Sequence, residues 1–290
     1  MTKNGWRTVL IESGSELSAK DDCLLIKKEA NLSRIPMDQI GILLIDEGKI
    51  LFSANLLSKL TSKNIKTIFC NEKHTPQCEI IPYCANSMIT ANFKKQIKWD
   101  ENAKDLMWQK IVKDKIKAQA CLIENVDQSA FEKLNIYYSD VEPGDKTNRE
   151  AQAARVYFNA LFGYEFRRRT ESSINHALNY GYAILLSAVN RFVSIHGYHT
   201  AIGINHKSDN NPYNLSCDLM EPFRPIIDGV VFQNQNRELD FFYKKEIISC
   251  IYSDIKYNGK NTKVISAIED YVEFILKQLP NCNEIFKNGA

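Results

Sequence analysis

Three acidic side chains and one histidine in the second half of the chain have the types and the spacing of a metal site. His206 precedes a short polar loop, and Asp218 and Glu221 follow that loop, three residues apart. If their segment is helical, both carboxylates project from one face. A further acid, Glu150, lies near the start of an amphipathic segment, residues 147–163. Carboxylates combined with one histidine suit Mg²⁺ or Mn²⁺ better than structural zinc.

Each of these residues also has a purely structural explanation. Thr147 and Glu150 have the spacing of a capping box, in which the glutamate returns to the first amide of its helix. A histidine in a loop is most often solvated or hydrogen-bonded. Asp218 and Glu221 could form a solvated helix face, but their neighbours are mostly apolar. Because a buried unpaired charge is costly, these two acids are expected to have a metal or another partner.

The elements that must position these side chains change in character along the chain. Short aliphatic runs between turn-forming residues predict strands at residues 7–11, 23–28, 40–45, 49–52 and 65–70, and a helix capped by Ser53. Apolar residues recur at helical spacing in residues 102–122, 173–195, 244–253 and 262–279. Residues 207–214 are rich in turn formers and predict a loop. The fold class is therefore α+β, with a β-rich domain, residues 1–76, before a helical domain, residues 77–290.

The composition is that of an ordinary globular protein. The chain has 290 residues, 44% apolar and 25% charged, which is enough for one or two domains. Its formal net charge is only +2, so composition alone does not indicate a nucleic-acid binder. The N-terminus lacks the apolar region of a secretory signal, and no apolar run is long enough to cross a bilayer. We therefore expect a cytoplasmic protein that has no membrane partner.

The 8 cysteines are spread along the sequence without a zinc-binding pattern. No Cys-x-x-Cys pair occurs, and the closest two, Cys78 and Cys84, lack further histidine or cysteine partners at zinc-finger spacing. We expect buried, reduced thiols without a metal or disulfide role.

Five blocks of the sequence resemble one known family, in order and in register. They are residues 5–9, 147–163 and 175–182, His206, and residues 218–228. Together they resemble the CRISPR-associated integrase, the first member of the numbered Cas series and the catalytic subunit of the spacer-acquisition complex. Residues 5–9 (Gly-Trp-Arg-Thr-Val) and 221–228 (Glu-Pro-Phe-Arg-Pro-Ile-Ile-Asp) are similar to the type II branch in particular.

The resemblance implies a fold, a site and partners. The implied fold is an N-terminal β-sandwich domain that forms a homodimer contact, followed by an all-helical catalytic domain. The implied ligands of Mg²⁺ or Mn²⁺ are Glu150, His206 and Glu221, with Asp218 as a catalytic acid that supports them or offers an alternative metal position. The implied reaction is transesterification, in which the 3′-hydroxyl of a short DNA fragment attacks a repeat array. The implied partners are DNA, a dimer of the small second adaptation subunit and, in type II systems, the effector nuclease and a ring-shaped DNA-end-binding subunit.

Basic side chains near these residues are candidates for holding the DNA backbone, because phosphate neutralisation supplies most sequence-independent affinity. The candidates are Arg167, Arg168 and Arg169, which form the densest basic run, with Lys207 and Arg224. Weaker candidates of the same kind are Lys94, Lys95, Lys110, Lys113, Lys115 and Lys117. A run of charge is usually a solvated face, and Arg224 can instead neutralise Asp218 or Glu221.

Two other classes of function fit the same residues. A metal-dependent nuclease would act on branched or damaged DNA without integration. A non-catalytic DNA-binding scaffold would keep the same side chains for a structural purpose. Integration of a labelled duplex into a plasmid separates an integrase from a nuclease, and metal-dependent activity of either kind excludes a scaffold.

Overall fold

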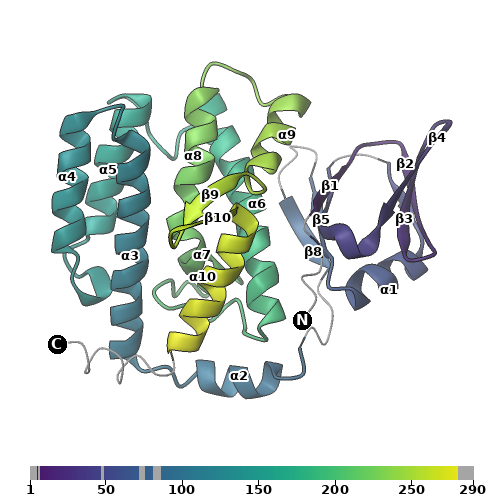
Figure 1. The fold of residues 1–290 in the computed structure, drawn as a ribbon, viewed down its shortest axis with the longest axis horizontal. Coiled ribbons are helices and arrows are strands. Elements are labelled where there is room, and N and C mark those ends of the chain that lie inside the picture. Colours follow the sequence, from purple (N-terminus) through teal and green to yellow (C-terminus); the bar gives the residue numbers. More distant parts are fainter. Residues whose placement is uncertain (1–4, 6, 47–48, 72–75, 81–85, 280–290) are drawn as a thin grey trace. The chain divides into compact units, whose positions relative to one another are not determined.

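The computed structural model describes the chain except residues 1–4, 6, 47–48, 72–75, 81–85 and 280–290 (Figure 1). The chain divides into two compact units, Met1–Ser87 and Met88–Ala290. The predicted boundary at residue 76 is too early. Strand β8 (Pro76–Ile80) pairs with β7 (Lys66–Cys70) and so belongs to the sheet of the first unit.

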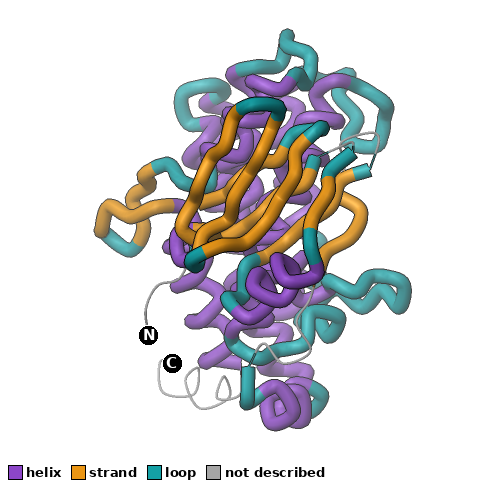
Figure 2. Tube along the Cα trace, turned by 90° about the vertical axis from the view of Figure 1, so that its right-hand side faces the viewer, coloured by secondary structure: helices purple, strands orange, loops and turns teal. Residues whose placement is uncertain are grey.

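The first unit contains, among its described residues, two four-stranded sheets and one α-helix, α1 (Ala54–Ser62) (Figure 2). One sheet has the order β1 (Arg7–Ile11), β5 (Ile40–Ile45), β7 and β8. The other has the order β4 (Asn31–Pro36), β3 (Cys23–Lys28), β2 (Ser15–Lys20) and β6 (Leu51–Phe52). Buried side chains of both sheets and of α1 share one apolar core. The β-rich character predicted for this region is confirmed.

The strands that the sequence predicted are those with continuous aliphatic runs. Strand β5 is buried along its whole length, because it lies between β1 and β7 and pairs in parallel with both. Helix α1 begins as predicted, with the Ser53 hydroxyl accepting a hydrogen bond from the amide of Leu56 at 3.3 Å. Strands β2, β4 and β8 of this unit were not predicted. Only one face of β2 is buried, and β4 is an exposed edge strand, so neither carries a strong apolar pattern.

The second unit is mainly helical. Its helices are α2 (Ile89–Gln96), α3 (Glu101–Ile123), α4 (Gln128–Asp140), α5 (Arg149–Phe162), α6 (Ser173–Ile195), α7 (Asn214–Met220), α8 (Arg224–Gln233), α9 (Phe241–Cys250) and α10 (Val264–Gln278), with short 3₁₀ turns η2 (Pro143–Asp145) and η3 (Glu221–Phe223). The expectation of an all-helical domain is wrong, because β9 (Asp254–Tyr257) and β10 (Lys260–Lys263) form an antiparallel hairpin. Asn258 and Gly259 turn this hairpin at positive φ, as a two-residue Asn-Gly loop does.

Two long helices organise the second unit. Helix α3 packs against α4, α5, α7, α8 and η3, and α6 packs against α7, α8, α9 and α10. Gly181 lets α8 approach α6 closely, since a Cβ atom there would lie 2.3 Å from a methyl group of Ile227. The segments that carry the predicted metal ligands are therefore anchored on these two helices. Helix α5 and η3 pack on α3, and the loop that carries His206 directly follows α6.

Two general expectations can be compared with the described residues. None of the helices described is both long enough and apolar enough to cross a bilayer. None of the six described cysteines forms a disulfide bond. The expectation of burial is wrong for Cys78 and Cys121, which are exposed. The remaining two, Cys84 and Cys282, lie outside the described residues.

Candidate active site

Glu150 lies in the first turn of α5, and its side chain does not cap that helix. The helix begins at Arg149, after Asn148, which adopts a left-handed conformation and makes no side-chain capping bond. The Asp145 carboxylate instead accepts hydrogen bonds from the amides of Arg149 (2.8 Å) and Glu150 (3.0 Å). The capping-box explanation is therefore wrong, and the Glu150 side chain reaches Lys115 of α3.

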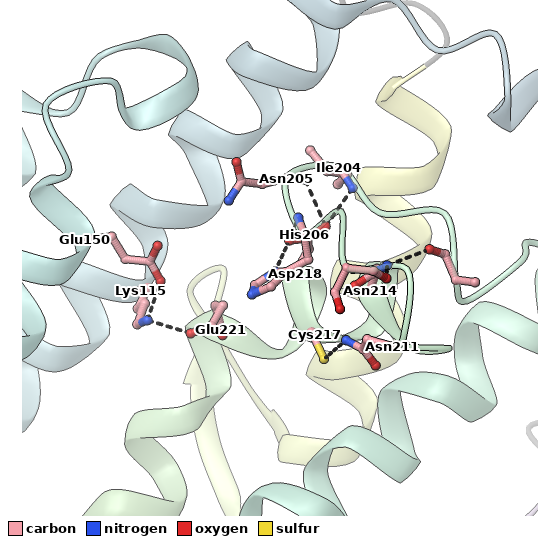
Figure 3. Close-up of polar contacts among 12 residues, drawn as sticks. Lys115, Glu150, Ile204, Asn205, His206, Asn211, Asn214, Cys217, Asp218 and Glu221 are labelled. Atoms are coloured by element: carbon pink, nitrogen blue, oxygen red, sulfur yellow. Dashed lines mark hydrogen bonds and ion pairs between the residues drawn. The ribbon is translucent and has the colours of Figure 1, made fainter. Parts of the chain in front are cut away.

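Lys115 lies between the two glutamates that were predicted as metal ligands (Figure 3). Its ammonium donates a hydrogen bond to Oε1 of Glu150 at 2.6 Å and forms an ion pair with Oε2 of Glu221 at 2.6 Å. Burial alone would lower the pKa of Lys115, but the carboxylates of Glu221 and Glu150 raise it above its ordinary value. The side chain is buried, so its weak candidacy as a contact to the DNA backbone is wrong.

Glu221 is buried in η3 and carries a second cationic partner. Its Oε1 accepts a hydrogen bond from Nε of Arg224 at 2.9 Å. For Arg224, this contact matches the predicted alternative in which the arginine neutralises a nearby acid. The Arg224 guanidinium also stacks on the ring of Tyr182, 4.4 Å from its centroid. Burial would raise the pKa of Glu221, but Arg224 and Lys115 hold it at about 2. This carboxylate is therefore ionised at neutral pH.

Asp218 holds the loop that presents His206. Its fully buried carboxylate accepts hydrogen bonds from the amides of Ile204 (2.6 Å), Asn205 (3.1 Å) and His206 (3.2 Å). It also bonds the ring Nδ1 of His206 at 2.6 Å, and this bond raises the pKa of the imidazole. With Nδ1–H donated to Asp218, the neutral ring keeps Nε2 for a ligand. These contacts are those of an acid that orients the histidine.

Gly203 allows the loop around His206 to pack closely against the Asp218 carboxylate. A Cβ atom at this position would lie 2.4 Å from the carbonyl oxygen of His206 and 2.8 Å from Oδ2 of Asp218. The loop is closed on its other side by Asn214, whose amide group donates to the carbonyls of Ala201 (3.0 Å) and Ser208 (2.8 Å). The position of the imidazole is therefore fixed by hydrogen bonds on both sides of the loop.

The donor set suits Mg²⁺ or Mn²⁺ in kind, but the side chains as placed do not surround one point. Among the described residues, no three His, Cys, Asp or Glu side chains converge closely enough to hold a metal ion. The ammonium of Lys115 takes the position between Glu150 and Glu221 that a cation would take. Oε2 of Glu221 is buried, and its contact within the described part of the chain is the ion pair with Lys115 at 2.6 Å. A buried carboxylate oxygen that is paired with a single cation fits a metal ligand, provided that Lys115 moves away.

The three consecutive arginines have different environments. Arg167 and Arg169 are exposed. Arg168 is half-buried and donates to the side-chain oxygens of Asn175 (3.1 Å) and Asn179 (2.7 Å) of α6. Arg168 is therefore less accessible than its two neighbours, because its guanidinium is bonded to α6. Arg167 and Arg169 keep the exposure that a contact with phosphate needs.

Lys207 lies beside the site. It is exposed and forms an ion pair with Glu101 at 3.3 Å. Together with His206, Lys104 and Asn211 it lines an open cleft next to the imidazole. The cleft gives a route from solvent to the ring.

The sequence did not identify the charged groups that join the site to its supporting helices. Besides Lys115 and Asp145, these include Asp228 of α8, which is buried and accepts hydrogen bonds from the hydroxyls of Tyr157 (2.8 Å) and Tyr182 (2.5 Å). Burial raises the pKa of Asp228 to about 6, although the two tyrosine hydrogen bonds oppose that shift. One signal for Lys115 was present, since it falls on the apolar stripe of α3, four residues after Ile111.

The fold and the site define a class of protein: a β-rich unit followed by a mainly helical one, with two glutamates and an aspartate-held histidine in the second. The family model of CRISPR associated protein Cas1 matches residues 8–256. The chain belongs to this family, which agrees with the resemblance noted in its sequence.

Three known proteins show how far the similarity extends. The chain is 34% identical over 273 residues to the CRISPR-associated endonuclease Cas1 of Neisseria meningitidis serogroup C (strain 8013), covering 92% of this chain and 90% of that protein. Its fold is similar to a casposase bound to integration product, with a TM-score of 0.74 at 17% identity and coverage of 94% and 91%. It is also similar to a Cas6-RT-Cas1–Cas2 complex, with a TM-score of 0.71 at 15% identity, covering 97% of this chain and 35% of that one. These two likenesses show a shared fold.

Proposed function

We propose that the chain is a Mg²⁺- or Mn²⁺-dependent DNA integrase and endonuclease of CRISPR spacer acquisition. It joins the 3′-hydroxyl of a short DNA fragment to a strand of the repeat array by transesterification. Membership of the Cas1 family supports this proposal, as does the name of the Neisseria relative, an endonuclease. The observation that carries it in this chain is the approach of Glu150 and Glu221 to one shared cation.

Each residue of the site has a defined part in this proposal. Glu150, Glu221 and Nε2 of His206 would hold the metal ion. When bound, the ion polarises the scissile phosphate and stabilises negative charge on the leaving oxygen. Glu221 is ionised at neutral pH and needs no deprotonation. Asp218 fixes the orientation and tautomer of His206. The attacking group is a hydroxyl of the DNA, so no protein nucleophile is required.

The exposed basic side chains would bind the DNA backbone. Arg167 and Arg169 are exposed, and Lys207 lies at the cleft beside His206. Contacts of this kind position DNA without reading its sequence. Arg224 donates a hydrogen bond to Glu221, so we assign it to holding that carboxylate in place.

The proposed assembly contains two homodimers of this chain and a dimer of the small second adaptation subunit. The similarity of fold to a Cas1-containing complex with Cas2 supports this partner. The blocks at residues 5–9 and 221–228 support a type II system, in which the effector nuclease and a ring-shaped DNA-end-binding subunit would take part.

The proposal is tested by following a labelled duplex with free 3′-hydroxyl ends into a supercoiled plasmid that carries a repeat, in Mg²⁺ and with the small adaptation subunit. We expect covalent transfer of the label to the plasmid. The matched control is the same duplex ending in 3′-dideoxynucleotides, which cannot attack and should transfer no label. Plasmid nicking that is independent of the 3′ ends, without transfer, would support the nuclease alternative. Absence of transfer and nicking would favour a scaffold.

A further inference from the structure

Lys115 is buried, which is unusual for a lysine. Helix α3 presents a buried apolar stripe that includes Ile111 and Ile116, and the side chain of Lys115 lies among these buried residues. Burying an ammonium is favourable only when opposite charges compensate it closely. The compensation comes from Glu150 on α5 and Glu221 on η3, so one cation connects three separate elements.

The two acids that contact this ammonium differ in exposure. Its contact with Glu150 is a hydrogen bond, and Glu150 is the more exposed of the two acids, with 24% of its side chain accessible against 5% for Glu221. Its contact with Oε2 of Glu221 is equally short, 2.6 Å in each case. Arg224 holds the other oxygen of Glu221. If the ammonium moved toward Glu150, the orientation of Glu221 would still be held by Arg224.

The four charged side chains around Glu221 and Glu150 sum to zero. Glu150 and Glu221 carry two negative charges, and Lys115 and Arg224 carry two positive charges. A divalent cation entering between the glutamates would meet an ammonium already in contact with both. Like charges at such distances repel strongly in a partly buried site. The ammonium must therefore withdraw from at least one glutamate before the ion can bind there.

We propose that Lys115 is a built-in counter-cation, which occupies the position between Glu150 and Glu221 in the metal-free protein and is displaced when a divalent ion binds. This inference rests on the proposed function, because it assumes that the glutamates are metal ligands. Lysine suits this task because its ammonium is a compact charge on a flexible stem. The side chain stabilises the metal-free fold and at the same time weakens metal binding.

The test replaces Lys115 by methionine, which keeps the length of the side chain and removes its charge. The matched control is Lys117→Met, an exposed lysine on the same helix. Two quantities are measured on the DNA-free protein: the thermal midpoint in EDTA, and the dissociation constant of Mn²⁺ by calorimetry. We expect Lys115→Met to unfold at a lower temperature in EDTA and to bind Mn²⁺ roughly tenfold more tightly than the unmodified protein, because a repelling charge is removed. Lys117→Met should match the unmodified protein in both.

The outcomes separate this inference from the function on which it rests. Mn²⁺ binding to Lys115→Met that is equal to or weaker than that of the unmodified protein would overturn the inference and leave the metal site standing. Absence of Mn²⁺ binding to every variant would overturn the metal site, and the inference with it. If Lys115→Met does not fold, Lys115→Gln removes the charge but keeps a hydrogen-bond donor for Glu150. Tighter Mn²⁺ binding by Lys115→Gln supports the inference, and unchanged or weaker binding overturns it.

Discussion

Replacing Asp218 by asparagine should loosen the loop that carries His206 and should reduce strand transfer without abolishing it. The carboxylate accepts four hydrogen bonds, two on each oxygen. Asparagine keeps one acceptor oxygen and puts an amide group in place of the other. If the amide group takes the position of Oδ2, it faces the N–H groups of Ile204 and Asn205. If it takes the position of Oδ1, it faces the amide and ring Nδ1–H of His206.

If the proton of the His206 ring stays on Nδ1, either orientation removes two hydrogen bonds from a fully buried group. Hydrogen bonds to charged groups contribute about 1.5–3 kcal/mol each, so the substitution should cost about 3–6 kcal/mol of folding free energy, less whatever the loop recovers by shifting. A domain with about 5–15 kcal/mol of stability remains folded after a loss of this size in most of that range. Loss of an orienting partner of a metal-bound histidine typically lowers activity about 10–100-fold.

Urea denaturation and single-turnover strand transfer measure the two effects on the same preparation. Asp209→Asn is the matched control, because Asp209 is an exposed acid in the loop between His206 and Asp218. It should change neither quantity. Unchanged stability and activity in Asp218→Asn would refute the role of the carboxylate in the loop. A stable Asp218→Asn variant that is as inactive as Glu221→Gln would show that Asp218 is itself a metal ligand.

Three further outcomes follow from the contacts of the second unit. Asp228 has a folded pKa of about 6 against an ordinary 3.8, so the folded state holds its proton more tightly. Urea denaturation at each pH measures the unfolding free energy of the unmodified protein and of Asp228→Asn. The difference between the two should fall by about 2 kcal/mol from pH 4 to pH 7. Charge reversal at Arg167 and Arg169 should lower the slope of log affinity against log salt for duplex DNA by about one unit per lost contact. An unchanged slope would show that neither arginine contacts the DNA backbone. Gly203→Ala should lower the thermal midpoint and strand transfer together, because its methyl group would lie 2.4 Å from the carbonyl oxygen of His206.

Elements with a strong local pattern were predictable, and those defined by their neighbours were not. Residues 40–45 match β5 because this run is aliphatic and buried along its whole length. Residues 173–195 match α6 because apolar side chains recur there at helical spacing on one broad buried face. Strand β4 is an exposed edge strand whose position depends on its pairing with β3. The hairpin of β9 and β10 had a local signal in Asn258 and Gly259, but its strands are short and polar.

In the candidate site, too, the residues with a local sequence signal were predictable and the contacts between distant residues were not. The residue types at positions 150, 206 and 221 indicated a carboxylate–histidine site, and the family resemblance assigned them. The capping-box pattern predicted a local partner for Glu150, but Asp145 caps the helix instead and leaves the glutamate to Lys115. That contact joins residues 35 positions apart. No local pattern contains it, although a lysine on a buried apolar stripe signals that an acid must lie nearby.

The decisive measurement is the metal dependence of strand transfer by the unmodified protein and by Glu221→Gln, with label transfer to supercoiled plasmid as the readout. The proposed mechanism predicts product in Mg²⁺ or Mn²⁺ and none in Ca²⁺ or EDTA, because Ca²⁺ accepts looser geometry and polarises phosphate poorly. It predicts no product from Glu221→Gln in any metal, with an unchanged circular dichroism spectrum. Full transfer in EDTA, or full transfer by Glu221→Gln in Mg²⁺, would contradict it.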